Sequence, residues 1–408
     1  MENTALLNCG ASEHAEASAS THKLALKTLR LVNFRSYSDS TLEIPTGPVV
    51  LAGQNGTGKT NCLEAISLLS PGRGLRGARL NEMQRKAPHD ASPSGVEDGF
   101  LCGASLWTVA ATLERTDGSW EVGTGLAPLS AGTNAKRVTH LNGAPAQSAD
   151  FADLAPMLWL TPAQDRLFLD GASDRRRFLD RLVFGLDGTH AKRANRYERA
   201  MRERLRLLKE GRFDPVWLDG LEETMANEGI AINEARENMI ELLNEELALR
   251  GEAGNFPCAY LALDDGLDGA GEAKALQEKL SAARRRDGES GRTNVGPHIG
   301  DLRVRHTLKR ADARDCSTGE QKALLISIVL ANAWLQKRRK MESAPILLLD
   351  EVIAHLDEQR RAALFDEILS LSAQAWMTGT DSSLFAPLAG DAALVSIEAG
   401  KFQTTDWP

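Results

Sequence analysis

The sequence predicts an α/β protein that is built around a phosphate-binding loop and interrupted by a helical insertion. A glycine-rich segment, residues 53–60, follows the short apolar run 49–52 and precedes a helical pattern. A second apolar run, residues 346–349, ends in two adjacent carboxylates. Parallel strands of an α/β sheet bring such loops together at one edge of the sheet. Between the two runs, over residues 191–290, helical periodicity replaces strand-like alternation.

Length and charge place the chain among globular proteins. It has 408 residues, of which 42% are apolar, and its 48 basic and 56 acidic residues leave a net charge of −8. At roughly 100–200 residues per domain, this length predicts two or three structural units. A net negative charge argues weakly against indiscriminate nucleic-acid binding, which usually needs a basic field.

The compartment is indicated by what the sequence lacks. It has no run of about 20 apolar residues, and its start has neither the basic residues nor the apolar stretch of a signal peptide. The five cysteines are scattered and form no Cys-x-x-Cys pair, which disfavours a disulfide framework or a zinc site. We therefore expect a cytoplasmic protein with no membrane partner.

The first part of the chain reads as a loose tail followed by strands. Residues 1–21 are small and polar, which predicts a flexible N-terminal tail. Residues 24–34 alternate apolar and polar side chains, as a half-buried strand does. Strand-like pieces between residues 99 and 150 are separated by Asp-Gly and Asn-Gly turn pairs. This pattern predicts an antiparallel β subdomain.

The insertion at residues 191–290 predicts an α-helical hairpin arm. Residues 191–212 carry nine basic and three acidic residues, whereas residues 221–249 carry eight acidic residues and one basic residue. Opposite charges on neighbouring helices favour their pairing. Residues 264–292, which are rich in glycine and charge, are expected to include a surface loop or the return from the arm.

The glycine-rich loop fits the phosphate-binding (Walker A) pattern GxxxxGK[ST] in the context of strand, loop and helix. Its glycines let the backbone wrap phosphates, Lys59 is placed to reach the β- and γ-phosphates, and the Thr60 hydroxyl is placed to ligate Mg²⁺. We therefore expect ATP and Mg²⁺ as cofactors. The predicted nucleotide-binding residues of this loop are Gly53, Gln54, Asn55, Gly56, Thr57, Gly58, Lys59, Thr60 and Asn61.

The second apolar run has the form of a Walker B strand, in which a buried central strand delivers acids to its end. Asp350 is expected to hold Mg²⁺, and Glu351 to orient or polarise the attacking water. With Lys59, Glu351 makes up the predicted catalytic set. The alternative is a buried strand that happens to end in two acids.

A third motif, Ser-Thr-Gly-Glu-Gln at residues 317–321, opens a long apolar helical run. Its structural interpretation is a capping box between Ser317 and Glu320. The order of Walker A, this signature, Walker B and the segment 355–357 resembles the head of an ABC-type ATPase. In that family the signature of one subunit closes over ATP held by another, which implies an ATP-dependent homodimer. Ser317, Gly319 and Asp357 would then complete the partner's site.

Three branches of these ATPases compete. Transporter ATPase subunits resemble LSGGQ at the signature and usually carry a histidine after Walker B, but here the corresponding strand, residues 376–380, reads Trp-Met-Thr-Gly-Thr. A chromosome protein of the SMC type would need hundreds of heptad residues in place of this insertion. The chain is similar to the RecF family in four further segments, in the family's order, at residues 29–37, 53–76, 174–180 and 291–298.

The resemblance divides the head into residues 22–190 and 291–408, on either side of the arm, and adds candidate nucleotide contacts. Gln164 would sense Mg²⁺ or the γ-phosphate, although the surrounding Thr-Pro-Ala-Gln-Asp departs from the family's form and an exposed loop amide is the alternative. Arg35 would lie near the base or phosphates, or else be a surface arginine. His298 and His355 are interpreted as structural.

Membership of the RecF family would imply a protein that dimerises on ATP, binds DNA at gaps and junctions, hydrolyses ATP slowly and helps load recombinase with RecR and RecO. A non-hydrolysing, nucleotide-gated DNA clamp is the rival function. The predicted DNA contacts are the basic residues Arg175, Arg176, Lys192, Arg193, Arg196 and Arg199. Basic side chains contact DNA phosphates without reading the bases. For each of these residues, the alternative is a basic side chain on a solvated helix face.

Overall fold

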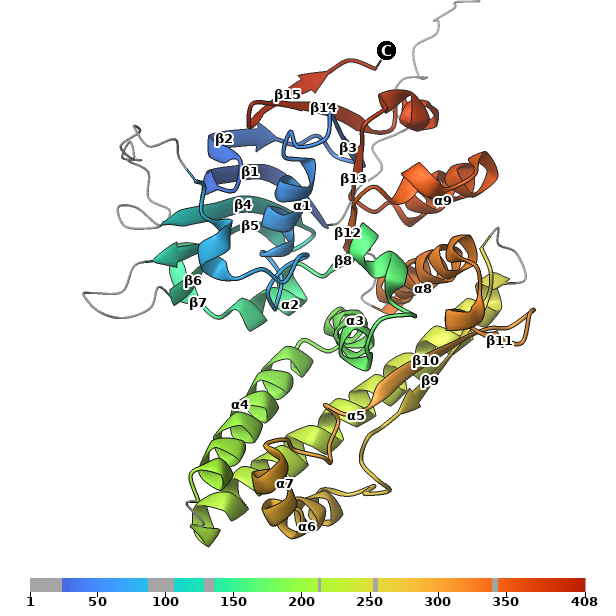
Figure 1. Cartoon of the computed structure of the whole chain (residues 1–408). Helices are drawn as coiled ribbons and strands as arrows, with labels where there is room; N and C mark the ends of the chain where they lie inside the picture. The colour runs from blue at the N-terminus through green and yellow to red at the C-terminus, as the bar shows by residue number, and fades with distance from the viewer. Residues whose placement is uncertain are drawn as a thin grey trace, which may run out of the picture.

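The computed structural model describes residues 24–86, 106–127, 136–211, 214–251, 256–339 and 344–407. The predicted tail, residues 1–21, lies outside them. Two six-stranded sheets stack with helix α1 (Lys59–Ser67) between them, and a helical arm extends away from the stack (Figure 1). None of the described helices has the length and apolar character needed to cross a membrane.

The first large sheet carries both the phosphate-binding loop, which follows β3, and the acidic pair Asp350 and Glu351, which follows β12. Its strand order is β15-β14-β3-β13-β12-β8, and all neighbours are parallel except β14 and β15. All four residues of β12 are buried, and β12 lies between β13 and β8, which confirms the predicted buried strand. The strands are β3 (Val49–Ala52), β8 (Met157–Leu160), β12 (Ile346–Leu349), β13 (Ala375–Gly379), β14 (Ala393–Glu398) and β15 (Lys401–Thr405).

The second large sheet is antiparallel throughout, in the order β2-β1-β4-β5-β6-β7, which confirms the predicted β subdomain. Asn142 (φ 48°) and Gly143 (φ 78°) adopt the left-handed conformations that a tight hairpin turn between β6 and β7 requires. Its strands are β1 (Leu24–Phe34), β2 (Tyr37–Glu43), β4 (Trp107–Arg115), β5 (Gly118–Ala127), β6 (Lys136–Leu141) and β7 (Ala144–Ala146).

Apolar side chains fill both faces of the parallel sheet. On one face, Leu63 and Ile66 of α1 pack with strands of both large sheets in a single cluster. On the other face, three helices cover the sheet and form the largest core of the described residues. These helices are α3 (Ala172–Phe184), α8 (Thr318–Arg339) and α9 (Glu358–Leu371). The β3–α1 loop is therefore held between two packed layers.

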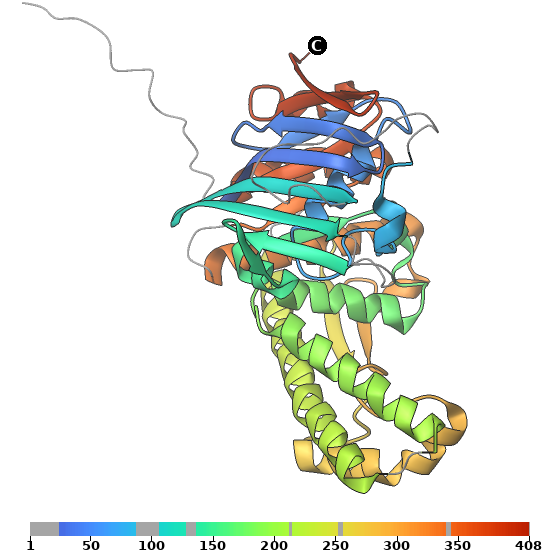
Figure 2. The same ribbon diagram turned by 90° about the vertical axis from the view of Figure 1, so that its left-hand side faces the viewer.

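The arm is a pair of antiparallel helices, α4 (His190–Lys209) and α5 (Pro215–Gly251), seen side by side in Figure 2. Arg196 pairs with Glu228 at 3.0 Å and buried Arg204 pairs with Glu222 at 2.8 Å, which confirms the predicted charge pairing across the seam. Asp287 also accepts from Arg204, at 2.8 Å. The arm thus has a charged core of its own.

Residues 264–292 hold two helices, α6 (Ala273–Ala282) and α7 (Arg284–Ser290), where the composition suggested a loop or return. Leu276 and Leu280 of α6 are fully buried against the arm. Apolar spacing within this short segment was masked by its glycine and charge content. A small antiparallel sheet, β11-β10-β9, then leads back to the head, with β9 (Ala259–Asp264), β10 (Asp301–His306) and β11 (Ala311–Asp312).

Helix α5 belongs to both arm and head. Met239, Leu243 and Leu247 in its second half are buried in the head core with α3 and α8. The range 191–290 therefore marks the insertion in the sequence, whereas in the structure the long helix α5 packs in both the arm and the head.

Shorter elements are α2 (Phe151–Leu154), η1 (Leu80–Met83), η2 (Ser148–Asp150), η3 (Pro162–Arg166), η4 (Ala313–Asp315), η5 (Val352–His355) and η6 (Ser382–Leu388).

Candidate nucleotide-binding site

The glycine-rich loop joins the end of β3 to the start of α1, as the sequence predicts. Gly58 has φ 116°, and a Cβ placed there would lie 2.6 Å from the Ser36 hydroxyl oxygen. The Tyr37 hydroxyl donates to the Gly58 carbonyl oxygen at 3.0 Å. Both the conformation and the close approach require glycine. The β1–β2 turn thus supports the loop from behind.

Lys59 folds back over its own loop. Its Nζ donates to the carbonyl oxygens of Gly53 at 2.6 Å and Gln54 at 2.8 Å, and the residue is only 5% exposed. Burial lowers the pKa of Lys59, while the carboxylates of Glu351 and Asp350 act to raise it. The ammonium group is therefore held at the loop and near both acids, where a phosphate can take over from the two carbonyl oxygens.

Asp350 connects the two distant motifs. Its Oδ1 accepts from the Thr60 hydroxyl at 3.0 Å and from the Thr378 hydroxyl at 2.9 Å. The Thr378 oxygen in turn accepts from the Glu351 N–H at 2.8 Å. Burial raises the pKa of Asp350, with the hydrogen bonds from Thr378 and Thr60 opposing the shift. Both hydroxyls use Oδ1, so Oδ2 can meet a cation without breaking either bond.

These donors fit Mg²⁺. A hydroxyl from Thr60 and a carboxylate from Asp350 are hard oxygen ligands, and Mg²⁺ is usually held by one or two carboxylates together with substrate phosphates. The described part of the chain contains no group of three or more His, Cys, Asp or Glu side chains placed to hold a metal. A metal at this site would thus depend on the nucleotide for its remaining ligands.

Glu351 follows Asp350 in the left-handed conformation, with φ 52°. It is partly exposed just after the end of β12, and its charge acts to raise the pKa of Lys59. A carboxylate that is open to solvent beside a buried Mg²⁺ ligand can take a proton from water. The position is compatible with the predicted role as a base.

Thr378 was not among the predicted site residues. It lies on β13, which pairs in parallel with β12 so that Leu349 faces Met377. This register places Thr378 beside Asp350. The sequence offers one signal for it, a polar residue near the end of an apolar strand. Unless the pairing of the strands is known, this signal does not distinguish Thr378 from the other threonines of the chain.

Arg35 is engaged behind the loop. Its guanidinium binds both oxygens of the fully buried Glu64 at 2.9 and 2.8 Å and donates to the Glu82 carbonyl oxygen at 2.8 Å. Arg35 takes this position because α1 presents the buried carboxylate of Glu64 to its guanidinium, and in this way it links α1 to the segment that follows. Contact of Arg35 with nucleotide stays a prediction.

Arg76 is a second residue that the sequence did not single out. It donates to the Asn61 side-chain oxygen at 3.1 Å and lies 3.5 Å from Glu64. Burial raises the pKa of Asp350, and the charge of Arg76 opposes this shift together with the hydrogen bonds from Thr378 and Thr60. The Arg76 side chain is 42% exposed, so it adds a solvent-accessible positive charge near the loop.

The segment with Gln164 follows β8, next to β12 in the sheet. Gln164 Oε1 accepts from the Thr161 N–H at 3.0 Å, so its amide caps the short helix η3. Asp165 pairs with Lys322 of α8 at 3.4 Å, which links this loop to the signature helix. The proposed sensing role of Gln164 remains a prediction.

The signature motif is exposed. Ser317 and Gly319 lie at the surface, and Glu320 Oε2 accepts from both the Ser317 N–H (3.1 Å) and the Ser317 hydroxyl (3.0 Å). The capping box is therefore present. Among the described residues, no hydrogen bond or ion pair joins segment 316–320 to the loop 53–60 of the same chain.

Asp357 begins α9. Its Oδ1 accepts from the Arg360 N–H at 2.8 Å, so Asp357 is the N-cap of that helix. His355 lies in η5. His298 is structural as expected: it bonds Tyr197 of the arm at 2.7 Å and the Thr293 carbonyl oxygen at 2.9 Å, and burial lowers its pKa.

Of the predicted DNA contacts, the two on α3 are bound within the chain. Arg175 forms a bidentate pair with Asp301 at 2.7 and 2.9 Å, which disfavours a role in DNA binding. Arg176 donates to the carbonyl oxygens of Ile299 and Gly300 and lines a cavity of about 280 Å³ between head and arm. The segment 299–301 is thus the partner of both arginines.

Three of the four predicted contacts on α4 pair with acidic side chains. Lys192 pairs with Asp150 at 2.9 Å, Arg193 with Asp187 at 3.4 Å and Arg196 with Glu228 at 3.0 Å. The side chains of Lys192 and Arg196 remain 46% and 66% exposed, and Arg199 is exposed as well. The helix therefore offers a basic surface to a long polyanion.

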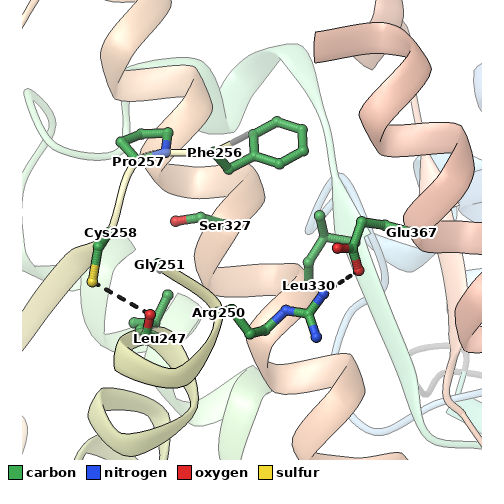
Figure 3. A pocket seen from close by; sticks show the side chains of 9 residues that line it. All are labelled: Leu247, Arg250, Gly251, Phe256, Pro257, Cys258, Ser327, Leu330 and Glu367. Atoms are coloured by element: carbon green, nitrogen blue, oxygen red, sulfur yellow. Dashed lines mark hydrogen bonds and ion pairs between the residues drawn. The ribbon is translucent and has the colours of Figure 1, made fainter. Parts of the chain in front are cut away.

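Figure 3 shows a separate cavity between α5, α8 and α9, lined by residues such as Arg250, Cys258 and Glu367. Arg250 pairs with Glu367, and the Cys258 thiol donates to the Leu247 carbonyl oxygen at 3.4 Å. Its volume is about 30 Å³, which is too small for a nucleotide. None of the predicted site residues lines it.

The chain is similar to known proteins over most of its length. The family described as RecF/RecN/SMC N terminal domain matches residues 25–393. The chain is 46% identical to the DNA replication and repair protein RecF of Rhizobium etli (strain CIAT 652), over 93% of this chain and 99% of that protein. It is 45% identical to the RecF of Brucella suis biovar 1 (strain 1330), over 93% of this chain and 96% of that protein.

Solved structures show the same fold. The structure of the recombination mediator protein RecF–ATP in the RecFOR pathway has a TM-score of 0.78 at 22% identity and covers 96% of this chain and all of that chain. An Smc head domain from Pyrococcus furiosus, with an extended coiled coil and bound to the C-terminal domain of ScpA, has a TM-score of 0.52 at 16% identity, over 94% of this chain and 96% of that chain. The ABC-type head predicted from the motifs is thus confirmed. Because the chain is 45–46% identical to RecF proteins over almost their whole length, it belongs to the RecF family.

Proposed function

We propose that this chain is a DNA replication and repair protein that binds Mg-ATP, dimerises over it and acts on DNA in recombinational repair. The observation that carries the proposal is the hydrogen bond between Thr60 and Asp350, which joins the phosphate-binding loop to the acidic strand next to Lys59 and Glu351. The names of the relatives at 45–46% identity support the biological role.

Each side chain has a defined task in ATP hydrolysis. Lys59 binds the β- and γ-phosphates in place of two loop carbonyl oxygens, and Thr60 and Asp350 hold Mg²⁺. The metal, when bound, withdraws charge from the phosphate oxygens. Glu351 accepts a proton from the attacking water. Because a second subunit must complete the site, hydrolysis would follow dimerisation, and slow hydrolysis would serve as a timer.

Dimerisation is proposed because the signature is incomplete within one chain. Ser317 and Gly319 are exposed at the start of α8, a helix N-terminus that suits a phosphate, and they make no contact with the loop of their own chain among the described residues. A second copy would supply the nucleotide, with Asp357 at the same interface. In a two-fold dimer this contact occurs twice.

DNA is the proposed polymer ligand, and RecR and RecO are the proposed partners. The exposed basic side of α4 supports contact with a duplex backbone at gaps or junctions. The RecFOR pathway, to which the RecF–ATP structure is assigned, supports the protein partners. ATP-driven dimerisation would bring two arms onto one DNA.

The test is the mass of the protein in solution by light scattering, with and without Mg-ATP. The wild type should double its mass on adding ATP, whereas Ser317→Arg, which places a bulky cation in the signature, should stay a monomer. Ser119→Arg, an exposed serine of β5, is the matched control and should dimerise. A wild type that stays monomeric at saturating ATP would contradict the proposal.

A further inference from the structure

Glu320 occupies the donors that the signature offers to a phosphate. The N–H and the hydroxyl of Ser317 both donate to the same carboxylate oxygen, Oε2 of Glu320. A γ-phosphate presented by a second copy would need these two donors. Carboxylate and phosphate therefore compete for one small site, and their like charges also repel each other.

Lys309 binds the other oxygen of that carboxylate. It comes from the turn between β10 and β11, and its Nζ pairs with Glu320 Oε1. The turn is anchored, because the Thr307 N–H and hydroxyl both donate to the Cys258 carbonyl oxygen, at 3.1 and 2.9 Å. Lys309 first, and then the two Ser317 donors, hold the pKa of Glu320 at about 2. The carboxylate is thus charged at neutral pH.

The same turn also carries an exposed apolar side chain. Leu308, next to Lys309, is 86% exposed, the most exposed of the large apolar side chains among the described residues. Its neighbour Lys309 pairs with Glu320 in the first turn of α8, a helix that begins next to the exposed Ser317. An apolar residue in this position is suited to contact with a second copy that closes over the signature.

We propose that Lys309 is a positioning residue for ATP-dependent dimerisation, because it neutralises Glu320 and holds that carboxylate when Ser317 turns to a phosphate of the second copy. This inference rests on the proposed function. Without Lys309, Glu320 would have Ser317 as its main partner and would also place an uncompensated negative charge beside the triphosphate. Both effects would weaken the dimer and leave ATP binding by the single subunit unchanged.

The experiment measures two quantities on the full chain: ATP affinity of the monomer at low protein concentration, and the ATP-dependent dimer dissociation constant by analytical ultracentrifugation. Lys309→Met should leave the first unchanged and raise the second about tenfold, because the contact is lost twice in a symmetric dimer. Lys309→Arg keeps the charge and should dimerise within about twofold of the wild type.

The double variant Lys309→Met with Glu320→Gln separates this role from a purely structural one. A neutral amide can still accept from Ser317 but does not repel phosphate, so dimerisation should return toward that of the wild type. Lys279→Met is the matched control, since Lys279 of α6 is a partly exposed lysine paired with Asp268 at 2.9 Å on the arm. It should dimerise normally.

Two outcomes would overturn the inference: a Lys309→Met protein that dimerises as tightly as the wild type, or a double variant that is no better than Lys309→Met. Thermal unfolding of each variant shows whether the fold is retained, and Lys309→Arg keeps the question answerable if Lys309→Met is unstable. Failure of the wild type itself to dimerise on ATP would instead contradict the proposed function.

Discussion

Gln374 ties the two large sheets together through the backbone of Leu26. Its Oε1 accepts from the Leu26 N–H at 2.8 Å, and its Nε2 donates to the Leu26 carbonyl oxygen at 3.0 Å. The pairing of β1 with β2 starts at Thr28, so no residue of β2 pairs with Leu26. Gln374 is 1% exposed, so a single buried amide, just before β13, satisfies two groups that would otherwise be unpaired.

Replacing Gln374 should therefore destabilise the head. Gln374→Ala leaves a buried N–H and a buried carbonyl oxygen of Leu26 without partners, and we expect a loss of about 2–4 kcal/mol in the free energy of unfolding. Urea denaturation measures it. Gln359→Ala, at an exposed position of α9, is the control and should change stability by less than about 0.5 kcal/mol. Equal stability of the two variants would contradict the role of the bridge.

Glu351→Gln distinguishes an ATPase from a non-hydrolysing clamp. If Glu351 accepts the proton from water, hydrolysis should fall about a hundredfold or more, and the ATP-bound dimer should live longer. Single-turnover hydrolysis and dimer lifetime are the measurements. Glu358→Gln, in the exposed first turn of α9, should leave both unchanged. Unaltered hydrolysis and lifetime in Glu351→Gln would favour the clamp.

Mg-dependent nucleotide binding should weaken on acidification. Burial raises the pKa of Asp350 above that of an ordinary aspartate, so its carboxylate takes up a proton, and loses its affinity for Mg²⁺, at a higher pH than usual. Titration of ATP binding with and without Mg²⁺, from neutral pH downward, tests this expectation. Asp350→Asn removes this titrating group, so any pH dependence that remains belongs to the nucleotide or to other groups of the protein. Identical pH profiles for the two proteins would contradict the prediction.

The basic side of α4 should set the salt dependence of DNA binding. Arg196→Ala and Arg199→Ala should each weaken binding to duplex DNA of any sequence and reduce the slope of log K against log salt by about 1. Fluorescence anisotropy at several salt concentrations gives that slope. Lys401→Ala, an exposed lysine on the edge strand β15, is the control. A slope that is unchanged in both arginine variants would remove α4 from the DNA interface.

The sequence by itself determined the parts of the site that depend on neighbouring residues. The loop 53–60 and the run 346–351 are recognisable because strand, turn and charged residue follow one another directly. The opposite charges of the two arm helices likewise predicted their pairing, which Arg204 and Glu222 confirm. Spacing along the chain sufficed, since local backbone conformation decides what these residues can do.

Only the tertiary structure decided which of the other polar residues take part. Thr378 reaches Asp350 through the parallel register of β12 and β13, and Arg175 pairs with Asp301, 126 residues away, which disfavours its predicted contact with DNA. Lys309 meets Glu320 because a hairpin turn is anchored to the strand beside it. Long-range pairing of strands and buried charges is not encoded in any short pattern, so these contacts exist only once the sheets and helices have packed.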